Sequence, residues 1–157
     1  MAVAWLVLVA MAPMLWTPLA TLLYAAGSLI CHQLPERSFH LHGSQLPVCA
    51  RCFGLYGGAA LGSVSAASMA GHAIAAWRVP AERRQWIGTV LAAMPTLATF
   101  ALEWGFGWRI TNSVRAAAAV PLGGMVAFVV VNALATLHYE QCVPTRPIGS
   151  SQPPTST

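Results

Sequence analysis

Long apolar runs, separated by short polar stretches, set the organisation of this 157-residue chain. A helix needs about 20 apolar residues to cross the hydrocarbon core of a bilayer. Four runs reach that length, at about residues 3–30, 48–70, 86–104 and 113–139. The pattern therefore predicts an all-α fold, an integral membrane bundle of four transmembrane helices with short loops.

The composition indicates the same class of protein. Hydrophobic residues make up 57% of the chain and charged residues only 8%, against about 25% charged residues in a typical soluble domain. The mean hydropathy is +0.62. So little polar surface cannot cover a water-facing globule. We therefore expect a protein of the cell (cytoplasmic) membrane, with the lipid bilayer as its main partner.

The first run contains Pro13 and Pro18, which a membrane bundle can accommodate as a kink. A cleaved signal peptide is the alternative interpretation, because Ala20, Ala25 and Ala26 are small residues of the kind found at cleavage sites. However, no basic segment precedes the run, and it exceeds the usual apolar core of about 7–15 residues. A transmembrane span is therefore the favoured interpretation.

The second run carries Gly54, Gly58 and Gly62 at four-residue spacing. One face of such a helix is nearly bare of side chains, so a neighbouring backbone can approach it closely. We predict a helix-packing face here. The alternative is that this spacing arises by chance in a segment rich in Ala and Gly.

We predict one transmembrane domain over residues 1–143 and a disordered tail over residues 144–157, where Pro, Ser and Thr are frequent. Four spans would place both termini on one side of the membrane. The loop arginines on that side are Arg78, Arg83, Arg84 and Arg146, against Arg37 and Arg109 on the other side. Arg51 and Arg115, at helix ends, make the two counts equal. Counted over the loops alone, the excess of arginine predicts cytoplasmic termini and a cysteine-rich loop outside.

Three of the four cysteines cluster at the junction of the first two spans. Cys31-His32 ends the first span, and Cys49-x-x-Cys52 begins the second. Positions three apart share a helix face, and the start of a helix favours thiolate. Because a short loop joins the two spans, both pairs belong at the same membrane face. The set Cys31, His32, Cys49 and Cys52 therefore predicts a tetrahedral zinc site.

Two other interpretations of the cysteines stay open. Cys49 and Cys52 could form a reversible disulfide that Cys31 resolves, as in a membrane thiol–disulfide redox protein. Alternatively the cysteines are only structural, in a transporter or a scaffold. Cys142 follows the fourth span and should lie on the opposite membrane face, so we leave it out of the cluster.

A second polar set lies at the same predicted membrane face. Its members are Arg37, Arg51, Glu103, Asn112 and Arg115. Ionisable groups at membrane depth are costly unless paired, so an ion pair of Glu103 with Arg115 or Arg51 is expected. One interpretation is a polar pocket beneath the cysteine loop that contacts a substrate or moves protons. The alternative is interfacial arginines and a helix cap without further function.

The sequence also excludes several classes of function. Eight arginines without any lysine are too sparse for a nucleic-acid surface. The chain has no Asp and no G-x-S-x-G, Walker A or H-E-x-x-H pattern, so hydrolase and nucleotidase activities find no support. An enzymatic role is the less favoured interpretation and stays open only as a thiol oxidoreductase, and no cofactor besides zinc is expected. A second copy of the chain or another membrane protein stays open as a partner.

The residues of both polar sets resemble a known family. The first set is similar to a signature block of the domain of unknown function 2085 in Cys31-His32-Gln33, Pro35-x-Arg37-Ser38-Phe39, Gly43, Pro47-x-Cys49-x-Arg51-Cys52 and Gly54-x-Tyr56-x-Gly58. Glu103 and Thr111-Asn112-x-x-Arg115, with Gly123 or Gly124, resemble a shortened form of the second signature block of this family. The family comprises small bacterial and archaeal membrane proteins. The resemblance implies a multi-pass membrane protein, which we expect to be bacterial, and it implies no reaction.

Overall fold

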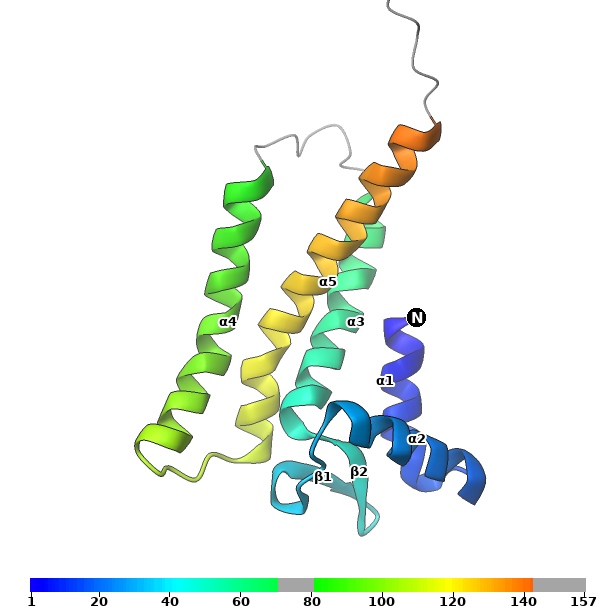
Figure 1. Cartoon of the computed structure of the whole chain (residues 1–157), viewed down its shortest axis with the longest axis vertical. Helices are drawn as coiled ribbons and strands as arrows, with labels where there is room; N and C mark the ends of the chain where they lie inside the picture. Colours follow the sequence, from blue (N-terminus) through cyan, green and yellow to red (C-terminus); the bar gives the residue numbers. More distant parts are fainter. Residues whose placement is uncertain (71–80, 143–157) are drawn as a thin grey trace, which may run out of the picture.

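The computed structural model describes residues 1–70 and 81–142, which form a mostly helical structure with one small hairpin (Figure 1). The predicted loop around Arg78 and the predicted tail, residues 144–157, lie outside the described residues. The elements are, in chain order, α1 (Ala2–Met11), the 3-10 turn η1 (Ala12–Met14), α2 (Thr17–Ile30), the 3-10 turn η2 (Pro35–Arg37), β1 (Ser38–Leu41), β2 (Ser44–Cys49), α3 (Ala50–Ala70), α4 (Ala81–Gly105) and α5 (Asn112–Cys142).

The first predicted span is not one helix, which corrects the expectation for residues 3–30. The chain leaves α1 through η1, which contains Pro13, and Leu15 and Trp16 are then extended before α2 begins. Pro18 stands in the first turn of α2, where its missing N–H costs nothing. The two prolines therefore divide the run instead of kinking it. In Figure 1, α1 runs alongside α3, whereas α2 lies across the hairpin end of the structure.

The predicted loop between the first two spans contains an antiparallel hairpin. Ser38 pairs with Cys49, and His40 pairs with Gln45. The two residues of the turn, His42 and Gly43, both have positive φ, at 51° and 81°. This is the backbone of the tight turns that suit the twist of a hairpin. A buried core joins the hairpin to α1 through Val9, Leu46 and Val48, with Trp5, Phe39, Cys52, Phe53 and Tyr56 packed around them.

The closest helix packing is between α3 and α5. A Cβ built on Gly54, Gly58 or Gly62 would lie 2.1–2.2 Å from a backbone oxygen of α5. Gly123 of α5 is equally tight against the carbonyl oxygen of Leu55. The predicted glycine face thus lies where the two backbones meet, and any side chain there would push the helices apart.

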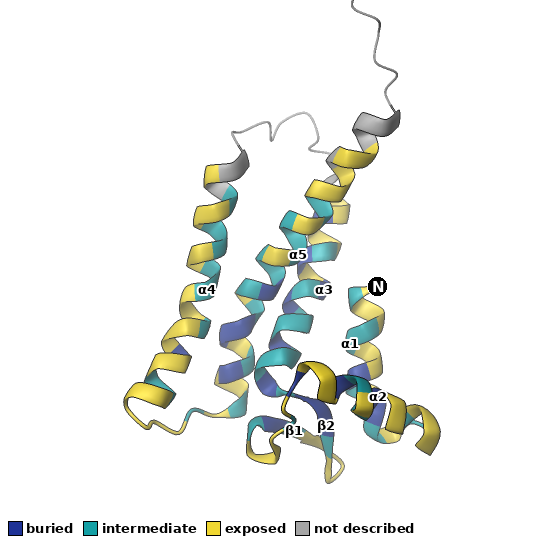
Figure 2. Ribbon diagram, viewed as in Figure 1, coloured by how far each residue is buried: buried dark blue, intermediate teal, exposed yellow. Residues whose placement is uncertain are grey.

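Helices α4 and α5 provide two segments long and apolar enough to cross a membrane, Gln85–Gly105 and Asn112–Ala135. Only 6% and 11% of these segments are buried inside the protein, and exposed positions run along both helices (Figure 2). The core helix of a soluble protein would be mostly buried. Long apolar helices left this exposed are typical of lipid contact.

Candidate metal centre

Three cysteines from three different elements meet at the hairpin end of α3. Cys31 follows the last residue of α2, Cys49 ends β2, and Cys52 lies in the first turn of α3. Their sulfur atoms all lie within 4.8 Å of one another. Cys31 is buried, whereas Cys49 and Cys52 are half-buried, and none of the three forms a disulfide.

Local backbone geometry brings Cys31 to the other two. The N–H of Cys31 donates to the carbonyl oxygen of Gly27 at 2.9 Å and closes α2. Cys31 itself is already extended, so the helix stops there. Two residues later Gln33 has a φ of 48°, in the left-handed region, which redirects the chain toward the hairpin. The hairpin then returns the chain to Cys49, and α3 begins at the next residue.

The side chain of Gln33 fastens α2 to β2. Its amide nitrogen Nε2 donates to the carbonyl oxygens of Tyr24, at 2.8 Å, and Pro47, at 2.7 Å. Gln45 donates in turn to the carbonyl oxygen of Gln33 at 2.5 Å. The approach is so close that a Cβ on Gly27 would lie 2.3 Å from the oxygen of Pro47. This clamp sets the position of Cys31 relative to Cys49.

The surroundings of the thiols favour negative charge on Cys49. The backbone N–H of Cys49 donates to the sulfur of Cys31 at 3.1 Å. The pKa of Cys49 falls to about 5, first because the Cys52 thiol hydrogen-bonds to it, with burial acting in the opposite direction. Smaller contributions come from the backbone N–H of Cys52, the Cys31 thiol and the backbone N–H of Arg51. Thiolate is the form that binds metal.

His32, the fourth member of the predicted metal set, does not join the thiols in this conformation. Its side chain is exposed, and the group of converging ligand atoms found among the described residues contains the three cysteines alone. The structure therefore brings together Cys31, Cys49 and Cys52 and leaves His32 next to them on the surface.

The second polar set forms an ion network that ties three helices together. Glu103, in the last turn of α4, accepts from Arg51 of α3 at 2.9 Å and from Arg115 of α5 at 2.5 Å. The three side chains are only 13% (Arg51), 5% (Glu103) and 11% (Arg115) exposed. The guanidinium of Arg51 also lies over the ring of Phe100, 4.6 Å from its centroid. Both ion pairs are therefore shielded from water.

Asn112 extends this network to the hairpin. Its amide nitrogen donates to the carbonyl oxygen of Ser38 at 3.0 Å, and its Oδ1 accepts from Arg115 at 2.8 Å. Arg115 also reaches the carbonyl oxygen of Glu36 at 3.5 Å. Arg37, the fifth predicted member, is half-buried and takes part in no ion pair among the described residues. Four of the five residues thus belong to one network.

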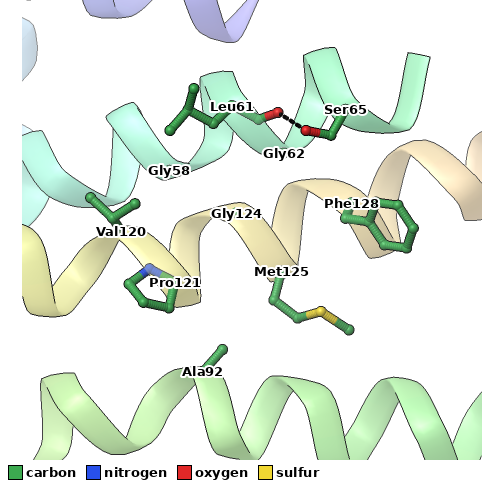
Figure 3. A pocket seen from close by; sticks show the side chains of 10 residues that line it. All are labelled: Gly58, Leu61, Gly62, Ser65, Ala92, Val120, Pro121, Gly124, Met125 and Phe128. Carbon is green, nitrogen blue, oxygen red and sulfur yellow. Dashed lines mark hydrogen bonds between the residues drawn. The ribbon is translucent and has the colours of Figure 1, made fainter. Parts of the chain in front are cut away.

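An apolar groove of about 400 Å³ lies between the helices, away from these polar groups. Figure 3 shows its lining, with Gly58, Gly62 and Ser65 from α3, Gly124 and Phe128 from α5, and Ala92 from α4. The Ser65 hydroxyl, the polar side chain of the lining, donates to the carbonyl oxygen of Leu61. The lining of this groove holds no titratable side chain.

Sequence reasoning missed Gln33 and Gln45 as the residues that position the cysteine site. Both partners of the Gln33 amide are backbone carbonyl groups of residues distant in sequence, Tyr24 and Pro47. The sequence around a loop glutamine does not indicate such partners. The one available signal was the place of Gln33 directly after Cys31-His32 in the family signature. Phe100 was missed for the same reason, since its partner Arg51 lies on another helix.

Comparison with known proteins finds relatives but no described activity. An uncharacterised protein of Methanocaldococcus jannaschii is 51% identical over 49 residues, 31% of each chain. An uncharacterised protein of Methanothermobacter thermautotrophicus is 57% identical over 30 residues, 19% of this chain and 27% of the relative. The matches therefore span less than a third of either relative. Both relatives are archaeal and lend no support to a bacterial origin. No solved structure matches the chain.

A family model covers much more of the chain than either relative does. The model described as "Predicted membrane protein (DUF2085)" matches residues 31–130. This range begins at Cys31 and includes the other two clustered cysteines, Glu103 and Arg115, as the resemblance of the two signature blocks implied. Since the match covers well over half of the chain, this protein belongs to the DUF2085 family of predicted membrane proteins.

Proposed function

We propose that this membrane protein binds one zinc ion through Cys31, Cys49 and Cys52. The observation that carries the proposal is the convergence of three thiols from three elements within 4.8 Å. Tetrahedral zinc with Zn–S bonds of about 2.3 Å would hold its sulfur ligands roughly 3.8 Å apart. Sulfur atoms that all lie within 4.8 Å of one another are compatible with that geometry, and the lowered pKa of Cys49 agrees with a bound thiolate.

The fourth zinc position is open in this arrangement. His32 would have to turn its side chain toward the thiols to fill the position, and otherwise a water molecule occupies it. Zinc sites with three protein ligands keep a position for exchange, whereas structural sites are closed by four. We assign the neighbouring network of Arg51, Glu103, Asn112 and Arg115 to holding α3, α4, α5 and the hairpin in place around the metal.

Metal analysis of the purified protein tests the proposal. The protein is extracted in detergent without chelators, and zinc is measured by inductively coupled plasma mass spectrometry against protein concentration. We expect about one zinc per chain in the wild type and a loss of at least tenfold in Cys49→Ser and Cys52→Ser. Cys142→Ser is the matched control and should keep its zinc. Wild type without zinc, or equal zinc in all variants, would refute the metal site.

A thiol–disulfide role is the rival that the same geometry allows, because the Cys49 and Cys52 sulfurs are neighbours. Forming that disulfide would release two protons and two electrons to a quinone or disulfide acceptor. Thiol trapping in cells under reducing and oxidising conditions separates the two roles. A zinc site leaves Cys49 and Cys52 trapped as thiols in both conditions, whereas a redox pair changes state.

We also propose that the hairpin lies on the outer side of the membrane and that the end of α5 lies in the cytoplasm. The arginine count of the loops supports this orientation, since Arg83 and Arg84 stand at the start of α4, the end distant from the hairpin (Figure 1), and Arg78 precedes them in the sequence. Cysteine substituted at His42, an exposed residue of the hairpin turn, should react with a membrane-impermeant maleimide on intact cells. Reaction only after lysis would reverse the orientation.

A further inference from the structure

Helix α2 stands apart from the other helices in direction and in packing. It lies across the hairpin end of the structure, transverse to α3 and α5 (Figure 1). Leu23 and Gly27 are its buried residues, and its closest packing is against β2. At 14 residues, it is about 21 Å long, too short for a hydrocarbon core of about 30 Å. Helix α2 is therefore too short to cross the membrane by itself.

Three faces can be distinguished around α2. Leu23 and Gly27 face the hairpin. Thr17, Thr21 and Ser28 share a second face, and all three are exposed. The third face repeats at helical spacing and carries Leu19, Leu22 and Leu29, which are 43%, 67% and 86% exposed. No charged residue occurs anywhere in the helix, so the helix is amphipathic without a strongly polar side.

Exposed aromatic residues mark the same end of the molecule. Trp104 at the end of α4 and Phe106 and Trp108 in the following loop are 73%, 72% and 65% exposed. Trp16, at the start of α2, is 79% exposed. Tryptophan gathers where the hydrocarbon core meets the headgroups. The loop after α4, the hairpin and α2 all lie at this end of the structure (Figure 1).

We propose that α2 lies in the plane of the membrane at the lipid–water interface on the hairpin side. The face of Leu19, Leu22 and Leu29 enters the acyl-chain boundary, and the face of Thr17, Thr21 and Ser28 points toward the headgroups and water. The exposed aromatic residues at the end of α4 and at the start of α2 would then lie at the same depth, where the hydrocarbon core meets the headgroups. Interfacial helices lie in the membrane plane with an apolar face buried at the boundary between headgroups and acyl chains.

This placement gives the bilayer a second role in the protein. Cys31 follows directly after Ile30, the last residue of α2, so a helix anchored in the interface holds the cysteine cluster at headgroup depth. The first apolar run then contributes an interfacial anchor where the sequence had predicted a transmembrane span. The inference does not depend on zinc, because it rests on the exposed face of α2 and on its direction.

Depth measurement by electron paramagnetic resonance tests the inference. Leu22 and Leu29 are replaced one at a time by p-acetylphenylalanine and labelled with a hydroxylamine nitroxide, which leaves the cysteines untouched. The full-length protein is placed in phosphatidylcholine and phosphatidylglycerol vesicles, and depth is read from collisions with oxygen and a nickel chelate. Seven residues of helix advance by about 10 Å along its axis, so a crossing helix must separate the two labels by nearly that depth.

We expect both labels on α2 to lie near the headgroups, within about 3 Å of the same depth. Leu97 and Trp104 on α4 have the same seven-residue separation and are exposed, so labels there should differ by about 10 Å. A depth difference near 10 Å on α2 would overturn the proposal, as would two labels fully accessible to the nickel chelate. Zinc that stays bound to the labelled proteins would show that their fold is intact. If the labels on α2 differ in depth by about 10 Å while zinc stays bound, the interfacial placement of α2 is wrong and the proposed metal site is unaffected.

Discussion

Glu103 is the side chain whose loss should affect the stability of the helical bundle most. Its carboxylate is 5% exposed and pairs with two guanidinium groups that are themselves 13% and 11% exposed. Glu103→Gln removes the negative charge while keeping nearly the same volume. The amide can still accept from one arginine, but Arg51 and Arg115 are left as two positive charges shielded from water without an anion.

The size of the effect follows from this burial. Breaking a buried ion pair by removing one partner costs about 3–5 kcal/mol, because the remaining charge has lost its compensation. The Nε of Arg51 already has no hydrogen-bond partner among the described residues, so the network has no spare acceptor for that arginine. For a chain of this size, 3–5 kcal/mol corresponds to a fall in Tm on the order of 10 °C.

Thermal unfolding in detergent, followed by circular dichroism, measures this fall. Glu36→Gln is the matched control, since Glu36 is exposed in η2 and only its backbone oxygen meets the network. We expect its Tm to stay within about 2 °C of the wild type, as for most surface substitutions. If the Tm of Glu103→Gln also stayed within about 2 °C of the wild-type Tm, the ion network would not hold the helices together and the reasoning would be refuted.

Three further substitutions test other parts of the structure. Gly58→Ala should destabilise the protein by about 1–3 kcal/mol in the same melting assay, because its Cβ would lie 2.1 Å from the carbonyl oxygen of Val120. Gly57→Ala is the control. A Cβ there meets nothing within 4 Å, so this substitution should be neutral or slightly stabilising. Gln33→Glu keeps the shape but cannot donate to Tyr24 and Pro47, so zinc affinity, measured by chelator competition, should fall about 10-fold; unchanged affinity would show that the clamp does not position Cys31. Gly43→Val places a β-branched residue at a φ of 81° and should cost about 1–3 kcal/mol, and an unchanged Tm would mean that the hairpin is not part of the cooperative unit.

The sequence predicted those features that depend on long or regular patterns. Apolar runs located α3, α4 and α5, with ends that differ from the structure by up to five residues. Of the described helices, α4 and α5 contain segments long and apolar enough to cross a membrane. The four-residue glycine spacing pointed to the α3 face that meets α5. Glu103 at the end of one helix and Arg115 at the start of the next placed both groups at one membrane face, where the structure pairs them.

Features that depend on single dihedral angles or on side-chain direction were not predictable. Pro13 and Pro18 are compatible with a kink or a break, and the extended backbone at Leu15 and Trp16 decides between them. The hairpin was missed because its strands are four and six residues long and one of them contains Pro47. His32 is exposed in the structure, and its place directly after Cys31 in the sequence gives no sign of that.

X-ray absorption at the zinc edge of the purified protein tests the central claim most directly. The account predicts a first shell of three sulfur atoms at about 2.3 Å and one nitrogen or oxygen atom at about 2.0–2.1 Å. Replacing Cys31, the most buried of the three proposed ligands, by serine should remove this sulfur shell. A spectrum of bound zinc with one sulfur or none in its first shell would contradict the metal site formed by Cys31, Cys49 and Cys52.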